Sequence, residues 1–164
     1  MALQIGQLWH YPLKSAQGRS LPSVMLSAYG VQHDRRWLLV DADGQMLTQR
    51  QQPQLGALQV QVVADALILT WAGQSILAQP SAVASERVSV WGDRMFAHAV
   101  SAVINQQLSA WLGLAVRLVY CPDQAQRVVD PRYAAGHHTG FSDGFPMLLL
   151  NQASLDHLSA AWGA

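Results

Sequence analysis

Residues 58–77 read LQVQVVADALILTWAGQSIL and contain three short strand patterns separated by two turn signals. In the first pattern, residues 58–62, apolar side chains alternate with glutamines, as expected for a strand with one buried face. Residues 66–71 and 74–77 are two further apolar runs, each preceded by a pair of small or turn-forming residues. Consecutive strands joined by two-residue turns predict an antiparallel sheet.

Further short runs of strand character occur along the first 120 residues. They lie at residues 3–9, 37–40, 46–48, 87–91 and 116–120. The second and third of these runs flank Asp41-Ala42-Asp43-Gly44, a sequence typical of a hairpin turn. Most of this part of the chain is therefore expected to form short strands.

One helix is expected among these strands, between Ser101 and Gly113. Serine is a favoured N-cap, and glycine commonly follows the last helical residue. The apolar residues between them lie on one stripe: Ile104, Leu108, Trp111 and Leu112. A helix with a single apolar stripe packs that stripe on a neighbouring element. The predicted fold class is α+β and strand-dominated, an antiparallel, β-barrel-like sheet module with one packed helix.

The pattern changes after residue 120. Residues 121–141 combine prolines, glycines and histidines without a hydrophobic period, which predicts a long exposed loop. Residues 147–150 then predict a buried strand, and Asn151 is a good N-cap for a helix that runs through residue 161.

These patterns predict a division of the chain into three parts. The parts are a module at 1–122, in which residues 1–15 are a candidate strand of a second domain, a loop at 123–140, and the opening of that second domain at 141–164. A strand and a helix with nothing downstream to pack against indicate a piece of a longer protein. Because an unfinished sheet leaves unpaired edges and apolar surface, we expect self-association or a loosely held C-terminal segment.

Composition excludes several classes of protein. Ten basic and ten acidic residues give a formal net charge of zero, which argues against partners recognised by bulk charge, such as nucleic acid or an acidic membrane. No apolar run is long enough to span a bilayer, and the N-terminus lacks the basic and apolar regions of a signal peptide. Cys121 is the single cysteine, so a disulfide framework and a thiolate zinc site are both excluded. We expect a soluble cytoplasmic protein.

Four segments, taken in order, resemble one family. They read YPLKS at residues 11–15, GVQHDRRW at 30–37, TQRQQP at 48–53 and FSDGFP at 141–146. The first three are similar to the Tyr-Pro-(Val/Ile)-Lys-Ser, Gly-x-x-x-Asp-Arg-x-Trp and Thr-x-Arg-x-x-Pro motifs of MOSC proteins with an N-terminal β-barrel-like module. The fourth resembles the start of their catalytic domain, and the resemblance covers essentially the whole chain. It implies such a module at 1–122 and an incomplete MOSC catalytic domain at 141–164.

The resemblance also implies a function. The family includes the amidoxime-reducing component and the C-terminal domain of molybdenum cofactor sulfurase, and its members bind a molybdenum–pterin cofactor. The reductases remove oxygen from N-hydroxylated compounds, and many bacterial members carry a ferredoxin domain that delivers electrons. The parent protein is therefore expected to be a molybdenum-dependent oxidoreductase that acts on small N-hydroxylated or related nitrogen or sulfur compounds with a ferredoxin-type electron donor.

By analogy with the family, six residues are cofactor-binding candidates. Three are expected to contact the cofactor phosphate and three to line the pterin pocket: Lys14, Ser15 and Arg35, then Ser142, Asp143 and Gly144. An ammonium and a guanidinium suit a phosphate, and a glycine lets a ligand approach the backbone. Plainer interpretations are a solvated lysine, a surface Asp34–Arg35 pair and a simple turn before a strand. Arg50 is interpreted as structural, binding backbone carbonyls.

One family feature has no counterpart in this chain. The family holds its molybdenum through a cysteine thiolate late in the catalytic domain, and Cys121 does not align with that position. Cys121 is expected to be a half-buried loop cysteine, and the chain alone is expected to be inactive, with no catalytic residue assigned. His137 and His138 are adjacent and point in different directions on an extended chain, so we assign them no metal. They could face substrate instead.

Two other functions fit the same sequence. One is a sulfur-transfer protein related to the sulfurase, whose pyridoxal phosphate chemistry would need a separate domain that does not fit here. The other is a non-catalytic recognition module that binds substrate or a partner protein. A patch of exposed tryptophans would favour the recognition module, with candidates Trp9, Trp71, Trp91 and Trp111.

Overall fold

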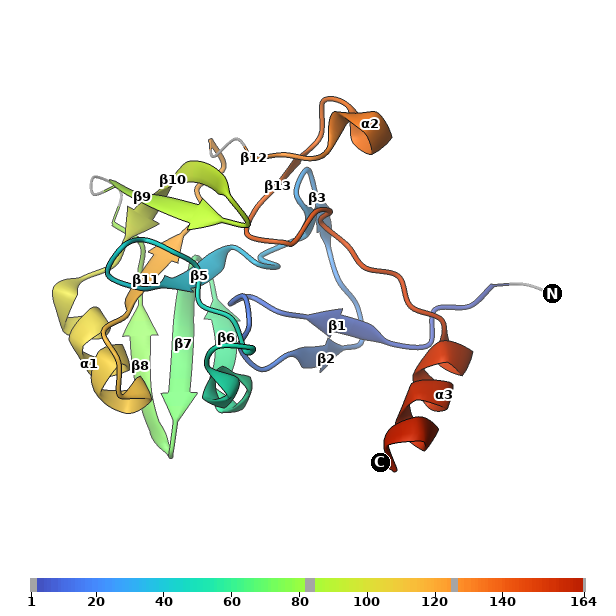
Figure 1. Cartoon of the computed structure of the whole chain (residues 1–164), viewed down its shortest axis with the longest axis horizontal. Coiled ribbons are helices and arrows are strands. Elements are labelled where there is room, and N and C mark those ends of the chain that lie inside the picture. The colour runs from blue at the N-terminus through green and yellow to red at the C-terminus, as the bar shows by residue number, and fades with distance from the viewer. Residues whose placement is uncertain (1–2, 82–84, 125–126, 164) are drawn as a thin grey trace.

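Two antiparallel sheets form the body of the protein in a computed structural model that describes residues 3–81, 85–124 and 127–163 (Figure 1). The four-stranded sheet has the order β5 (Trp37–Val40), β11 (Arg117–Tyr120), β10 (Asp93–Ala99) and β9 (Ser85–Val90). The three-stranded sheet consists of β6 (Gln59–Val63), β7 (Ala66–Trp71) and β8 (Gln74–Ala78). This strand-dominated α+β architecture is the predicted one.

The three-stranded sheet follows the sequence pattern closely. Val63 pairs with Ala66 and Trp71 pairs with Gln74, so both connections are two-residue turns.

Two other segments differ from the prediction. The 46–48 run forms no strand and makes only a bridge from Met46 to Val40. Strand β10 was not predicted. Its residue Phe96 is apolar yet 60% exposed, so hydrophobic alternation does not mark the strand.

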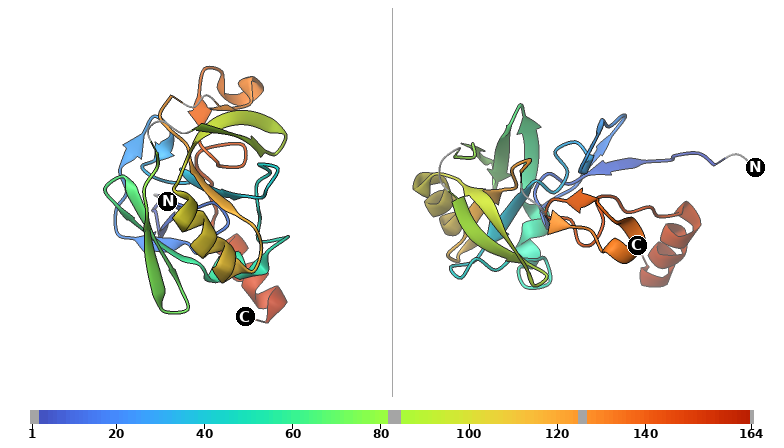
Figure 2. Two further views of the ribbon diagram at one scale, coloured as in Figure 1. Left: turned by 90° about the vertical axis from the view of Figure 1, so that its left-hand side faces the viewer. Right: turned by 90° about the horizontal axis from the view of Figure 1, so that it is seen from above.

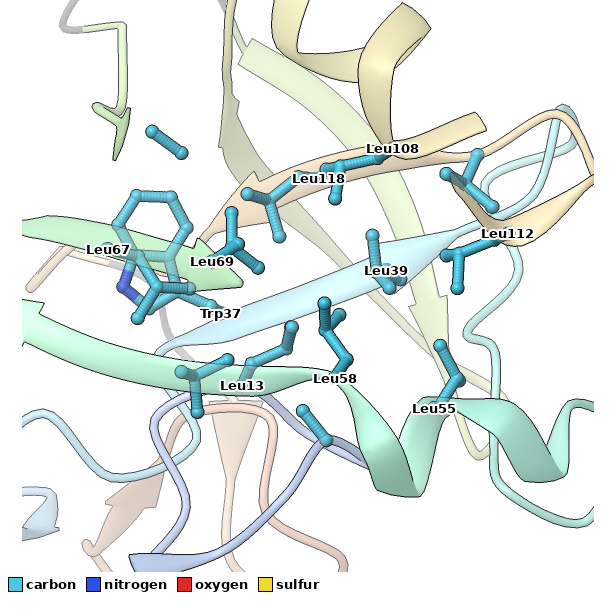
Figure 3. Packing of buried hydrophobic residues seen from close by; sticks show 14 of the residues in the cluster. Leu13, Trp37, Leu39, Leu55, Leu58, Leu67, Leu69, Leu108, Leu112 and Leu118 are labelled. Atoms are coloured by element: carbon cyan, nitrogen blue, oxygen red, sulfur yellow. The ribbon is translucent and has the colours of Figure 1, made fainter. Parts of the chain in front are cut away.

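Strand β5 is buried on both faces. Successive side chains of a strand point to opposite sides, so Trp37 and Leu39 join one core cluster while Leu38 and Val40 join another. The first cluster fills the space between the two sheets and the helix α1 (Ala102–Leu112), as Figure 3 shows. A strand buried on both sides explains why residues 37–40 are apolar without interruption.

Helix α1 has the predicted boundaries. The Ser101 side chain accepts a hydrogen bond from the backbone N–H of Ile104, and Gly113 has the left-handed conformation with φ of 68°. Leu108 and Leu112 are buried in the first core cluster. The helix therefore packs on the sheet as its stripe predicted.

Smaller elements connect and flank these sheets. They are β1 (Leu8–His10) paired with β2 (Arg19–Leu21), β3 (Leu26–Ser27) with β4 (Gly30–Val31), β12 (Arg127–Val128) with β13 (His138–Thr139), the 3₁₀ helix η1 (Pro53–Ala57), and the helices α2 (Pro131–Ala134) and α3 (Gln152–Trp162). None of the described helices is long and apolar enough to cross a membrane. The predicted domain boundaries stay predictions.

Four local predictions were wrong. The 3–9 run forms a strand only from Leu8, because its first described residues lie exposed beyond β2. Residues 121–141 are not one exposed loop, since they contain β12, α2 and β13 and end at the buried Phe141. Residues 147–150 are exposed and pair with no described strand. Cys121 is fully buried in the second cluster, because it directly follows β11 and its backbone N–H donates to the Arg36 carbonyl.

The C-terminal helix α3 forms as predicted but buries nothing. Its cap Asn151 accepts a hydrogen bond from the backbone N–H of Ser154, and no described residue of the helix is buried. The views in Figures 1 and 2 place α3 and the N-terminal tail away from the two sheets. The helix is therefore held by its own hydrogen bonds and not by packing.

Candidate functional site

Lys14 is held in place by the backbone of β5. Leu13 forms a parallel bridge with Trp37, and the Lys14 N–H donates to the Trp37 carbonyl at 2.9 Å. The side chain is buried, and its Nζ lies 2.5 Å from Asp143 Oδ1. Burial lowers the pKa of Lys14, and the hydrogen bond and charge of Asp143 oppose that effect. Lys14 is therefore a buried, partnered ammonium and not a solvated surface lysine.

Asp143 accepts two hydrogen bonds on the same oxygen. Besides Lys14, the indole Nε1–H of Trp91 donates to Oδ1 at 2.8 Å. Partial burial raises the pKa of this carboxyl, but the hydrogen bonds from Lys14 and Trp91 and the positive charges of Lys14 and Arg35 hold the pKa below its ordinary value. Asp143 is thus ionised at neutral pH and joins the C-terminal loop to the β9–β10 hairpin.

Arg35 contacts Tyr11, three residues before Lys14. The backbone N–H of Arg35 donates to the Tyr11 carbonyl at 2.8 Å, and the Arg35 guanidinium lies 4.5 Å from the centre of the Tyr11 ring. The guanidinium also donates to the buried Asp34 carboxylate, which accepts from the Tyr11 N–H at 2.7 Å. The positive charge of Arg35 lowers the pKa of Lys14, so the two cations share one electrostatic environment. The Asp34–Arg35 pair is therefore built into the site.

The 140–144 segment crosses directly beside Arg35. The Phe141 N–H donates to the Arg35 carbonyl at 2.9 Å, and a Cβ at Gly140 would lie 2.9 Å from that same oxygen. Glycine is therefore required at residue 140 for the close approach. Ser142 is buried, whereas Gly144 is exposed with open space around it. No contact within the described chain demands glycine at residue 144.

Ser15 lies next to Lys14 with a left-handed backbone, φ 66°. Its carbonyl accepts from Gln49 Nε2 at 3.0 Å, so the third family-like segment supports the Lys14 loop through Gln49. Arg50 donates no hydrogen bond to a carbonyl of the described residues, so its predicted structural role stays a prediction. It is exposed, and its guanidinium lies 5.8 Å from the centre of the Trp91 ring.

Arg127 belongs to the site, although the sequence did not single it out. This buried arginine donates to Asp93 Oδ2 at 2.9 Å, to the Ser142 carbonyl at 2.5 Å and to the Asp143 carbonyl at 2.6 Å. It thereby connects the backbone of the 142–143 loop to Asp93, the first residue of β10. The available sequence signal was an arginine beside two valines within a polar segment.

The remaining candidates are two histidines, the cysteine and four tryptophans. His137 is exposed and His138 is half-buried, and no three His, Cys, Asp or Glu side chains of the described chain gather as metal ligands. Burial raises the pKa of the Cys121 thiol to about 11. Among the four tryptophans considered, Trp9 and Trp91 are about half exposed, while Trp71 and Trp111 pack against the core. The four do not form one exposed patch.

The sequence is similar to proteins of one family. The MOSC N-terminal beta barrel domain matches residues 2–115. Mitochondrial amidoxime reducing component 2 of Bos taurus is 29% identical over 168 residues, covering 94% of this chain and 50% of the relative. Molybdenum cofactor sulfurase of Oryza sativa subsp. japonica is 46% identical over 48 residues, covering 29% of this chain and 6% of that protein.

One solved structure has a related fold. The solution structure of a Bordetella bronchiseptica protein superposes with a TM-score of 0.50 at 15% identity, covering 69% of this chain and 98% of that protein. The chain spans about half the length of the amidoxime-reducing relatives it matches. Because the family match covers most of the sequence and the fold agrees, the chain belongs to the MOSC N-terminal beta barrel domain family.

Proposed function

We propose that this chain is the N-terminal part of a molybdenum-cofactor-binding MOSC oxidoreductase, and that it binds the cofactor's terminal phosphate. The observation that carries the proposal is the buried ammonium of Lys14 at the meeting point of segments 129 residues apart. An ammonium has three N–H donors. Within the described chain its acceptor is Asp143 Oδ1, which leaves two donors for phosphate oxygens.

The residues present fit such a group. Lys14 supplies a point charge, Arg35 supplies guanidinium donors beyond those that face Asp34, and Ser15, the residue after Lys14, adds a hydroxyl. Asp34 and Asp143 hold the two cations in position. The open surface at Gly144 leaves room for a flat ring beside the Ser142–Asp143 backbone. Ser142, Asp143 and Gly144 are therefore the proposed lining of the pterin pocket.

When bound, the molybdenum centre supplies oxygen-atom transfer, with small N-hydroxylated or related compounds as proposed substrates and a ferredoxin-type donor as the electron source. The described residues bind and orient the cofactor. Cys121 cannot serve as the metal ligand, because it is buried in the second core cluster and burial raises its pKa to about 11. We therefore propose that the chain alone is inactive and that the metal's thiolate comes from another part of the full-length protein.

The test is cofactor content after expression in a host that makes the cofactor. We expect pterin bound per protein to fall by about tenfold or more in Lys14→Ala/Arg35→Ala, since each lost charge-assisted hydrogen bond is worth about 1.5–3 kcal/mol. Arg132→Ala is the matched control, because Arg132 is an exposed arginine paired with Asp130. Equal pterin in the double variant and the wild type would show that these cations do not bind the phosphate.

The similarity to molybdenum cofactor sulfurase favours a second candidate, a protein that transfers sulfur to the cofactor without redox turnover. The full-length protein distinguishes the two functions. If the full-length protein catalyses the reduction of an N-hydroxylated compound by a chemical reductant, the oxidoreductase function is supported. Incorporation of labelled sulfur into added cofactor, without such reduction, supports sulfur transfer.

A further inference from the structure

Trp91 occupies a backbone conformation that a bulky side chain rarely adopts. Val90 pairs with Asp93, so Trp91 and Gly92 form the two-residue turn of the β9–β10 hairpin, with φ of 53° and 94°. Such turns favour Asn, Asp or Gly, because both central residues have positive φ. The β7–β8 hairpin has the small residue Ala72 in the same position, with φ of 47°. The tryptophan at residue 91 therefore has a strained backbone conformation.

Core packing does not explain this tryptophan, since its side chain is 49% exposed. Its neighbours are instead the charged groups of the candidate site. The Nε1–H donates to Asp143 Oδ1 at 2.8 Å, and Lys14 Nζ lies 5.7 Å from the ring centre. Arg50 lies 5.8 Å from the same ring. Strain retained beside buried charge commonly indicates a functional residue.

We propose that Trp91 is a ligand-binding residue, a platform on which a planar heteroaromatic ring stacks when the ligand's anionic group reaches Lys14. This inference rests on the proposed function and assigns its aromatic contact. The hydrogen bond to Asp143 fixes the edge of the indole, and the two-residue turn fixes its backbone, so the ring has little freedom to lose on binding. Stacking on an indole suits an electron-poor ring such as a pterin.

The test compares two probes, neopterin phosphate and inorganic phosphate, by calorimetric titration of the whole chain. We expect Trp91→Asn to weaken neopterin phosphate about tenfold, the scale of one lost ring-stacking contact. Inorganic phosphate should bind as it does to the wild type, and the Tm should stay equal or rise because Asn suits the turn. Lys14→Ala should weaken both probes.

Two control variants make the result specific. Ala72→Asn introduces the same residue in the β7–β8 turn and should leave both affinities unchanged. Trp91→Phe keeps an aromatic face and loses the N–H donor, so it should retain most of the neopterin phosphate affinity.

Three outcomes overturn the inference. The first is wild-type affinity for neopterin phosphate in Trp91→Asn. The second is a lower Tm with an equal loss of both probes in that variant, which would make Trp91 a structural residue. The third is a loss in Trp91→Phe as large as in Trp91→Asn, which would make it a positioning residue for Asp143. If neither probe binds the wild type, or if Lys14→Ala binds phosphate normally, the proposed function fails and the inference fails with it.

Discussion

At the scale of single residues, the site depends on charges that the chain itself compensates. Lys14 pairs with Asp143 and Arg35 pairs with Asp34, while Arg127 joins Asp93 to the 142–143 backbone. A ligand anion would therefore bind cations that already have carboxylate partners, through the Lys14 donors that Asp143 does not use.

Asp143 gives the protein a predictable response to acid. Because its pKa is lowered in the folded state, the stability it contributes is fully present above the ordinary value of 3.8 and is lost as pH falls through the lowered value. We expect Asp143→Asn to remove that part of the acid dependence. Thermal unfolding of both proteins from about pH 7 down to about pH 3 checks this, and parallel curves would contradict it.

Removing Arg127 should cost more than removing an exposed arginine. Arg127→Met leaves two carbonyls and the Asp93 carboxylate without their donor, which should lower the free energy of unfolding by about 3 kcal/mol. Arg132→Met breaks an exposed pair and should cost less than about 1 kcal/mol. Urea unfolding measures both. A small effect at Arg127 would mean that the 142–143 loop is held by other contacts.

At the scale of secondary-structure elements, two helices of equal length differ in what they stabilise. Both α1 and α3 span 11 residues with a capping side chain at the N-terminus. Helix α1 buries Leu108 and Leu112, whereas no described residue of α3 is buried. Of these two helices, α1 is therefore the one that is coupled to the core.

The two caps offer a direct test of this difference. Ser101→Ala should lower the free energy of unfolding by about 1 kcal/mol, because loss of the cap weakens a helix that packs on the core. Asn151→Ala should reduce helical circular dichroism while leaving the main unfolding transition unchanged. A shared decrease in stability would show that α3 packs on the body.

At the scale of the whole molecule, apolar side chains lie exposed along the C-terminal segment. Residues 147–150 are all exposed, and so are Leu155, Leu158 and Trp162 on α3. Contiguous apolar surface of this kind promotes association. We expect the isolated chain to self-associate as its concentration rises.

Sedimentation velocity tests the association. Leu148→Ser/Leu149→Ser should lower the weight-average mass at high concentration, because both side chains are strongly exposed. The exposed polar change Gln32→Ser, on a different part of the chain, serves as the control. A wild-type chain that stays monomeric throughout would contradict the prediction.

The sequence by itself determined the elements whose signals are local. Two-residue turns and short apolar runs, alternating with glutamines in β6, defined β6, β7 and β8, and the Ser101 and Gly113 caps defined α1. Such signals are local because backbone conformation and capping depend on residues a few positions apart. Family-like segments also identified Lys14 and Asp143 as candidates, though neither their contact nor the burial of Lys14 was predictable from the sequence.

Only the tertiary structure decided which of these residues meet. It joined Lys14 to Asp143 across 129 residues, buried Arg127 against the 142–143 backbone and placed Trp91 beside Asp143. It also left residues 147–150 without a partner among the described strands, where the apolar run had predicted a buried strand. The physical reason is the same in each case, because burial and pairing depend on which segments the folded chain brings together and not on local side-chain pattern.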